Sequence, residues 1–425
     1  MNCLVCIFVL ALKKLSSTTS PATTAQCDSW RGSDERLKVT VLSSEWGSSK
    51  CGLSTMIREI AILLATNSEV EVTLLVPQFS CKDEDKRAAA SRNITILDAE
   101  KRPGFEDPLD WLISPPRNHT IDVIVGHGGE LGKQAQFIRD SHKCKWVQVV
   151  HTAPEELGMH KVYSKAISKG EEKSETEIDL CKLANLVMAV GPKLATIYSS
   201  YLRSCEKDIF QLTPGVFSDL TVVKQASKEG LIFKVLVFSH DDTEDFNVKG
   251  YDIAAKAIVE LEDQSYSLVF VGAPDGKHEE VAQQFLQCGI RKNQLIVRKF
   301  VENRDKLKEL LCEVDLAIMP SRTEGFGLAA LEALSAGLPI LVSSNSGFGE
   351  ALQAIPYGDS FVVDSEDCKK WAKAITAVRK KDRAQRLEEI QTLRKKYEEQ
   401  YSWQKLRKDL IDKMWNLSHG RLVHL

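Results

Sequence analysis

The chain has 425 residues, too many for one ordinary hydrophobic core, so we expect two or three domains. Its composition, 43% hydrophobic and 27% charged, is typical of a soluble globular protein. The net charge of −3 excludes the broad basic surface by which proteins bind nucleic acids, so any phosphate-binding site must be local.

The chain begins with a ten-residue apolar run, CLVCIFVLAL, at residues 3–12. The run is well short of the roughly 18–20 residues that span a bilayer, so we expect no transmembrane span. It has the character of a signal-peptide core, but its basic pair, Lys13-Lys14, follows it instead of preceding it. We expect residues 1–34 to be a disordered or processed lead.

Cysteines and glycosylation sequons bear on the cellular compartment. The eleven cysteines are irregularly spaced, with no metal-type spacing and a single C-x-x-C pair, Cys3 and Cys6, inside the apolar run; this favours reduced, mostly buried thiols over a disulfide framework. We therefore expect a cytoplasmic protein. The apolar N-terminal run and three N-x-S/T sequons, at Asn93, Asn118 and Asn416, leave the secretory pathway open.

Short apolar strands alternate with helices from Leu37 onward. In the first half we expect strands at residues 37–44, 70–77, 93–97, 121–128, 146–152 and 186–191, with a helix at 54–66. A bend at TPGVFSD and the polar stretch KQASKEG interrupt this pattern at residues 213–230. The pattern then restarts, with strands at 231–239, 266–274, 294–301, 315–321 and 338–344, and helices at 250–261, 302–314 and 328–336.

This alternation predicts an α/β fold of two tandem, doubly wound parallel-sheet domains of the Rossmann type. We place the domains at residues 35–215 and 230–395, facing each other across a cleft, and we expect a separate helix at 396–425. Ligands of open α/β sheets bind outside the carboxyl ends of the strands, so the informative residues should directly follow strands.

One such stretch is SRTEGFGLAALEALSAGLPILVS, which occupies residues 321–343. Its glycines on both sides of Phe326 let main chain approach a ligand, and the helix that follows presents free N–H groups to an anion. Glu332 lies on a helix that is otherwise apolar, and such a carboxylate needs a partner or a polar cavity. We expect it to pair with the hydroxyls of a ligand such as a ribose rather than with protein.

The two glutamates, spaced as E-G-F-G-L, E-A-L and G-L-P-I in this chain, resemble the signature of retaining nucleotide-sugar glycosyltransferases of the GT-B fold. These are the family 4-like enzymes, also called glycosyl transferases group 1. The resemblance covers residues 37–420. It implies that Glu324 contacts the donor sugar and Glu332 the ribose hydroxyls, and that the C-terminal helix crosses back to the first domain. The main chain at Gly325, Phe326, Gly327 and Leu328 would hold the phosphates.

Other positions resemble the family more loosely. The resemblance places His151, in VVHTAPEEL, near the donor sugar, and Lys249, in NVKGYDIAAKAI, against the diphosphate. It also places Gly52 and Ser54 on the acceptor side, in the Gly-rich loop SSEWGSSKCGLST. GHGGELG, at residues 126–132, follows a strand and is a weaker candidate for the cleft.

Two positions depart from the family pattern. Ser239-His240 stands where the family usually has Gly-Arg, and Cys51-Gly52 stands where it often has Gly-Gly. We expect His240 to face the diphosphate. A histidine is largely neutral at pH 7, whereas an arginine is permanently charged and can bind a phosphate bidentately, so both departures bear on catalytic efficiency.

The sequence thus predicts transfer of a sugar from a UDP- or GDP-linked donor to an unknown glycan, lipid or small-molecule acceptor, with no prosthetic group. No Asp-x-Asp follows a strand, so we expect no metal requirement; HDDTED, at residues 240–245, is interpreted as a polar loop. Two alternatives remain: a catalytically weak nucleotide-sugar-binding protein, and a phosphorylase or epimerase of the same fold.

Overall fold

The structure is a computed structural model that describes residues 36–47, 52–162, 164–238, 245–301 and 303–420. The expected lead at residues 1–34, and the Cys51 and Ser239-His240 departures, lie outside the described residues. From Arg36 onward the chain forms one compact unit. In that unit we call residues 36–215 the N-terminal half and residues 230–420 the C-terminal half.

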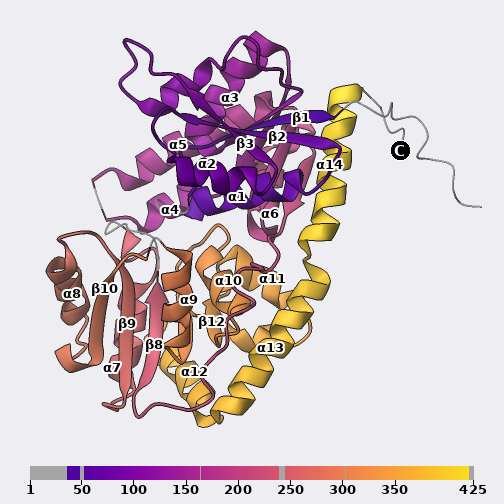
Figure 1. Ribbon diagram of the computed structural model, residues 1–425. Coiled ribbons are helices and arrows are strands. Elements are labelled where there is room, and N and C mark those ends of the chain that lie inside the picture. Colours follow the sequence, from indigo (N-terminus) through magenta and orange to yellow (C-terminus); the bar gives the residue numbers. More distant parts are fainter. Residues whose placement is uncertain (1–35, 48–51, 163, 239–244, 302, 421–425) are drawn as a thin grey trace, which may run out of the picture. The chain divides into compact units, whose positions relative to one another are not determined.

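The N-terminal half contains a seven-stranded parallel sheet with the strand order β3-β2-β1-β4-β5-β6-β7 (Figure 1). Its strands are β1 (Leu37–Leu42), β2 (Val70–Pro77), β3 (Ile94–Ala99), β4 (Val123–His127), β5 (Lys145–Val150), β6 (Leu186–Val190) and β7 (Ile209–Leu212). Consecutive apolar residues are buried because helices cover both faces; all five residues of β6 are buried. The helices are α1 (Gly52–Ala65), α2 (Asp83–Ala90), α3 (Gly128–His142), α4 (Pro154–His160), α5 (Ala166–Leu183) and α6 (Pro192–Tyr201).

The C-terminal half contains a six-stranded parallel sheet with the order β10-β9-β8-β11-β12-β13. Its strands are β8 (Phe233–Phe238), β9 (Tyr266–Ala273), β10 (Leu295–Lys299), β11 (Leu316–Met319), β12 (Ile340–Ser343) and β13 (Val362–Val363). Its helices are α7 (Tyr251–Glu260), α8 (His278–Gln287), α9 (Arg304–Cys312), α10 (Leu328–Ser335), α11 (Gly347–Gln353), α12 (Cys368–Lys380), α13 (Arg383–Gln400) and α14 (Trp403–His419).

In both sheets the chain adds strands first to one side of the first strand and then to the other. This switch in strand order lies at the β1/β4 pair and at the β8/β11 pair. At such a switch point the loops on neighbouring strands diverge and leave a crevice at the carboxyl ends. The expectation of two tandem doubly wound parallel sheets is confirmed.

The C-terminal helix α14 packs against the N-terminal half, where it contacts α1. Arg407 Nη1 donates to Thr66 Oγ1 at 3.1 Å, and Lys413 forms an ion pair with Asp208. Figure 1 shows the yellow helices α13 and α14 running from the second sheet toward the first. These contacts join the two ends of the described chain.

Two observations concern membranes and thiols. Across the described ranges, no helix combines the length and the apolar character needed to cross a bilayer. The seven cysteines within these ranges are free thiols, and three of them, Cys81, Cys144 and Cys181, are buried. The expectation that most thiols would be buried therefore does not hold for these seven.

Candidate active site

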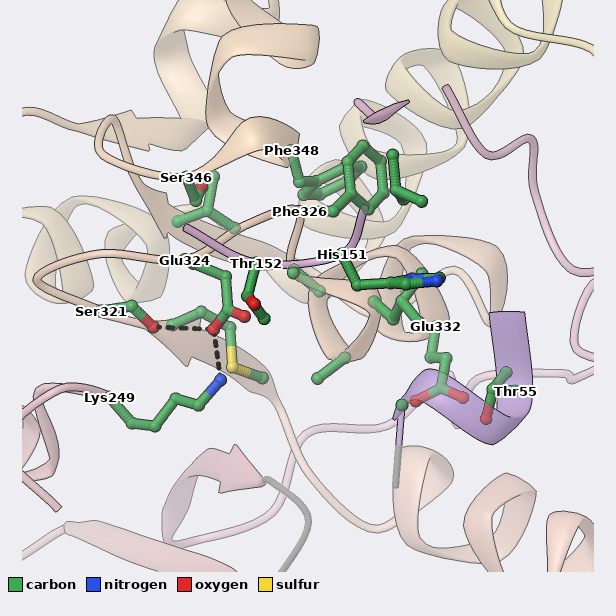
Figure 2. A pocket seen from close by; sticks show the side chains of 18 of the residues that line it. Thr55, His151, Thr152, Lys249, Ser321, Glu324, Phe326, Glu332, Ser346 and Phe348 are labelled. Carbon is green, nitrogen blue, oxygen red and sulfur yellow. Dashed lines mark hydrogen bonds and ion pairs between the residues drawn. The ribbon is translucent and has the colours of Figure 1, made fainter. Parts of the chain in front are cut away.

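A cavity of about 410 Å³ lies at the carboxyl ends of the strands and is lined by both halves (Figure 2). The N-terminal half contributes Gly52, Thr55, His151 and Thr152, and the C-terminal half contributes Lys249, Ser321, Glu324, Glu332, Ser346 and Phe348, among others. His151 directly follows β5, and the Ser321 loop follows β11. The cavity therefore occupies the crevice that the strand order creates.

Two glycines allow the loop between β11 and α10 to take its path. A Cβ atom on Gly325 would lie 2.2 Å from the carbonyl oxygen of His151, so only a glycine lets this loop pack against the end of β5. Gly327 has a φ of +104°, a left-handed conformation that strains any residue with a side chain. Leu328 then begins α10, whose first N–H groups have no carbonyl partner within the helix, and it lines the cavity.

Glu324 and Lys249 form an ion pair inside the cavity. Lys249 Nζ lies 2.5 Å from Glu324 Oε2, which also accepts a hydrogen bond from Ser321 Oγ at 3.5 Å. Figure 2 shows the three side chains pointing toward one another. Burial alone would lower the pKa of Lys249, but the charge of Glu324 outweighs it and raises that pKa. Lys249 is therefore a cation at any physiological pH.

Arg322 ties the Glu324 loop to the turn that carries Lys249. Its main-chain N–H donates to the Val248 carbonyl oxygen at 2.8 Å, and its guanidinium donates to the Asn247 carbonyl oxygen at 2.5 Å. The guanidinium also binds both carboxylate oxygens of Asp252, at 2.7 and 3.0 Å. Such a bidentate pair fixes orientation as well as distance. Arg322 thus holds Lys249 and Glu324 in register.

Glu332 has a partner in the protein. The residue is 7% exposed, and Oε1 accepts a hydrogen bond from Arg304 Nη1 of α9. Arg304 also binds Asp219 through two hydrogen bonds of 2.9 and 3.1 Å. Burial raises the pKa of Glu332, while the Arg304 charge opposes that shift. Among the residues that the structure describes, Oε2 of Glu332 takes no hydrogen bond, and the residue lines the cavity.

The expectation that Glu332 pairs only with a ligand is therefore wrong. That expectation considered the residues three and four positions away on its own helix, and these are indeed apolar or small. The charge that reaches Glu332 comes from α9 and from Asp219, 28 and 113 positions away in the chain. Its assignment to a ribose stays a prediction, now for the oxygen that Arg304 does not bind.

Phe326 is buried at the back of the loop. Its ring packs edge-to-face on Phe348 with centroids 5.8 Å apart, and a Cβ on Gly191 would lie 2.4 Å from its Cδ2. The main-chain N–H of Phe348 donates to the Phe326 carbonyl oxygen at 2.7 Å. The ring therefore anchors the loop to α11 and to the end of β6. Phe326 contributes to the site through its main chain and through this packing.

His151 pairs with a second buried histidine. His127, the last residue of β4, is 1% exposed, and its Nδ1 lies 3.0 Å from His151 Nε2. Burial lowers the pKa of His151 to about 3. Burial, with a smaller effect of the His151 charge, also lowers the pKa of His127 well below its usual value. Both rings are therefore neutral near pH 7.

The two residues expected on the acceptor side divide between the cavity and the core. Gly52, the first residue of α1, lines the cavity as expected, but Ser54 is 1% exposed and is not among the lining residues. Because successive residues of a helix point about 100° apart, the neighbouring Thr55 lines the cavity in its place. Thr55 and Glu332 both line the cavity and are labelled in Figure 2.

Two expectations are left untested. His240 and most of the HDDTED loop lie outside the described residues. The approach of His240 to a phosphate therefore stays a prediction. Within the part of the chain that the structure covers, no group of three His, Cys, Asp or Glu side chains is placed to hold a metal ion. The expectation of metal-independent chemistry stays a prediction as well.

A model of the family described as "Family 4 Glycosyltransferase in conflict systems" matches residues 40–410 of the chain. The chain belongs to the family 4 glycosyltransferases. The resemblance drawn from the Glu324 and Glu332 signature is therefore confirmed, and with it the expectation of a retaining enzyme with the GT-B fold.

Individual relatives are distant. The chain is 25% identical over 250 residues to the lipopolysaccharide glucosyltransferase WaaG of Escherichia coli K12, which covers 56% of this chain and 63% of WaaG. It is 24% identical over 325 residues to the D-inositol 3-phosphate glycosyltransferase of Corynebacterium urealyticum, covering 70% and 72%. Anabaena Alr3699/HepE, solved in complex with UDP-glucose, superposes with a TM-score of 0.66 at 14% identity, covering 90% of this chain and all of that one.

Three charged residues of this glycosyltransferase escaped sequence reasoning. Arg304 lies at the start of a helix that was expected, but nothing in the sequence pairs it with Glu332. Arg322 lies inside the signature, two residues before Glu324, but the signature itself is defined by the two glutamates. Lys193 follows Gly191-Pro192 at the end of β6, so its position after a strand was the available signal. His127 lies in GHGGELG, which the sequence indicated only as a weaker candidate for the cleft, without a role for the histidine.

Proposed function

We propose that this family 4 glycosyltransferase transfers a sugar from a nucleoside diphosphate sugar, with UDP as the favoured nucleotide, to an acceptor hydroxyl with retention of anomeric configuration. One observation carries the donor assignment: the Lys249–Glu324 pair lies beside the N-terminus of α10 in a cavity that both halves line. A cation and a helix N-terminus favour a diphosphate, and a carboxylate accepts hydrogen bonds from sugar hydroxyls. The UDP-glucose bound by HepE supports the choice of UDP.

In this proposal the donor lies along the C-terminal half. The diphosphate rests against Lys249 and the main chain from Gly325 to Leu328. The free oxygen of Glu332 binds the ribose hydroxyls. Glu324 and the neutral His151 contact the sugar. The acceptor approaches from Gly52 and Thr55 on α1.

The reaction would use the leaving group as its base. The bond between the anomeric carbon and the phosphate oxygen breaks, and the acceptor oxygen bonds to the same face of that carbon. The acceptor proton passes to the departing phosphate oxygen. The negative charge that develops on the diphosphate is stabilised by Lys249 and by the N–H groups at the start of α10. These groups are already in position before the reaction begins.

The test is to incubate the full chain with UDP- and GDP-sugars and to measure released nucleotide, with EDTA, with inorganic phosphate, and with neither. We expect slow release from a UDP-sugar in water, unaffected by EDTA, with the α- or β-configuration of the donor kept in the product by NMR. Lys249→Met should abolish release. Binding of the UDP-sugar without release in the presence of an acceptor library would instead indicate a binding protein, and phosphate-dependent release a phosphorylase.

A further inference from the structure

Lys193 carries a buried positive charge from the N-terminal half into the loops of the C-terminal half. The residue is 5% exposed and lies in the first turn of α6. Its Nζ lies 2.8 Å from Glu156 Oε2 of α4 and donates to Thr323 Oγ1 at 2.8 Å. It also lies within hydrogen-bond distance of Asn345 Oδ1 and the Asn345 carbonyl oxygen, at 3.1 and 3.2 Å. We call these four residues the interdomain cluster.

The charges of the cluster are balanced inside it. Thr323 Oγ1 donates to Glu156 Oε2 at 2.5 Å, so the carboxylate accepts from both halves. Burial alone would raise the pKa of Glu156, but the hydrogen bonds from Lys193 and Thr323 outweigh it and lower that pKa. Glu156 is therefore ionised at neutral pH. A buried cation that is paired and fully hydrogen-bonded in this way is costly to disturb.

The cluster is one hydrogen bond away from Glu324. Thr323 directly precedes Glu324 in the chain. The Asn345 carbonyl oxygen, which accepts from Lys193, also accepts from the main-chain N–H of Glu324 at 3.1 Å. Asn345 Nδ2 donates to the Arg322 carbonyl oxygen, so the same residue holds the loop on its other side. Lys193 thus fastens both segments that determine where the Glu324 carboxylate lies.

We propose that Lys193 is a positioning residue, which holds the Glu324 loop in its working geometry from across the boundary between the two halves. The proposal rests on the proposed function of Glu324 toward the donor sugar. Its consequence is that Glu324 is placed correctly only while the N-terminal half is seated against the C-terminal half. Correct placement matters because a shift of about 1 Å at a reacting centre can cost on the order of 100-fold in rate.

The experiment compares Lys193→Met, the charge-keeping Lys193→Arg, and the charge-balanced double variant Lys193→Met/Glu156→Gln. The double variant leaves no unpaired carboxylate and so keeps the test informative if Lys193→Met does not fold. We expect kcat with a UDP-sugar to fall about tenfold or more in the double variant, with partial recovery in Lys193→Arg. Lys182→Met removes an exposed lysine paired with Asp179 and serves as the control.

Two readouts separate positioning from general destabilisation. Hydrogen exchange of the peptide over residues 321–327 should quicken in the double variant, while exchange in β1 and β8 stays as in the native chain. Added to Glu324→Gln, the double variant should cost little further turnover, because both act through one carboxylate. Native kcat and native exchange at 321–327 in the double variant would overturn the proposal. If Glu324→Gln itself keeps native turnover, the role of Glu324 fails, and the exchange measurement still decides whether Lys193 holds the loop.

Discussion

The two walls of the cavity, one formed by each half of the chain, differ in charge. The C-terminal wall is built from ion pairs, Lys249 with Glu324 and Arg304 with Glu332. The N-terminal wall presents main chain, hydroxyls and the neutral ring of His151, whose pKa burial lowers to about 3. Behind that wall, burial raises the pKa of Glu177 to about 7, so even this carboxyl carries little charge below neutral pH.

The difference indicates a division of labour. Fixed charges and helix termini stabilise a charged nucleotide, and in the proposed function the acceptor approaches the wall whose described residues carry no fixed charge. Charge from the N-terminal half meets the C-terminal half in the interdomain cluster, where Lys193 and Glu156 cancel each other, and in the ion pairs Lys161–Asp245 and Asp208–Lys413.

Glu324→Gln should have the largest effect. The substitution keeps the shape of the side chain but removes the charge that faces Lys249 and the proposed donor sugar. We expect turnover to fall on the order of 100-fold, the scale typical of losing one electrostatic group in an active site. Nucleotide release from a UDP-sugar measures it. Glu313→Gln, which removes an exposed carboxylate paired with Arg298, is the control and should retain native turnover. Equal turnover in the two variants would contradict the proposed role of Glu324.

Arg304→Met should destabilise the protein and make nucleotide affinity depend on pH. The variant leaves Glu332 buried without its cation, which costs several kcal/mol in fully buried pairs and about 2 kcal/mol here, because Arg304 is partly exposed. The pKa of Glu332, which burial already raises, should rise further. Ionised Glu332 would then form only as pH increases, so UDP affinity should strengthen from pH 6 to pH 8. Calorimetry at both pH values checks this, and equal affinities would contradict it.

Glu177→Gln tests whether the buried carboxyl of Glu177, behind the N-terminal wall of the cavity, is neutral. The folded pKa of about 7 lies above the usual 4.5, so the folded state keeps a proton that the unfolded state releases. The contribution of this carboxyl to the free energy of unfolding is therefore fully present below pH 4.5. It is lost as pH rises toward 7, by about 1.4 kcal/mol per pH unit. Denaturant unfolding at pH 5 and pH 7 should show a smaller loss in Glu177→Gln than in the native chain. Identical pH slopes would mean that Glu177 is ionised when buried.

His151→Asn should change the level of activity but not its pH profile. With a pKa of about 3, His151 stays neutral between pH 5.5 and 8.5 and titrates no charge in that range. The ratio kcat/KM for the donor should therefore keep the same shape in both proteins. An inflection near pH 6 to 7 that disappears with the substitution would show that His151 ionises during the reaction.

Local patterns in the sequence predicted the two sheets and the signature loop, because period and turn chemistry are local properties. Strand β6 reads as an apolar run, and Gly327 as a turn residue, without knowledge of any partner. Partners far apart in the chain could not be predicted in this way. Arg304 reaches Glu332 from another helix, and Lys193 reaches Thr323 across 130 positions, so only the folded chain reveals either pair. Ser54 and Thr55 differ by one helical step, which loop resemblance does not resolve.

The two glutamates of the C-terminal wall are proposed to have separate roles, Glu332 toward the nucleotide and Glu324 toward the sugar, and UDP calorimetry tests this division most directly. Glu332→Ala should weaken UDP binding about tenfold or more, since a hydrogen bond to a charged group contributes roughly 1.5–3 kcal/mol. Its fold should survive, because Arg304 keeps its two hydrogen bonds to Asp219. Glu324→Gln should bind UDP like the native chain. Unchanged UDP affinity in Glu332→Ala, with the protein folded, would contradict the assignment of this wall to the nucleotide.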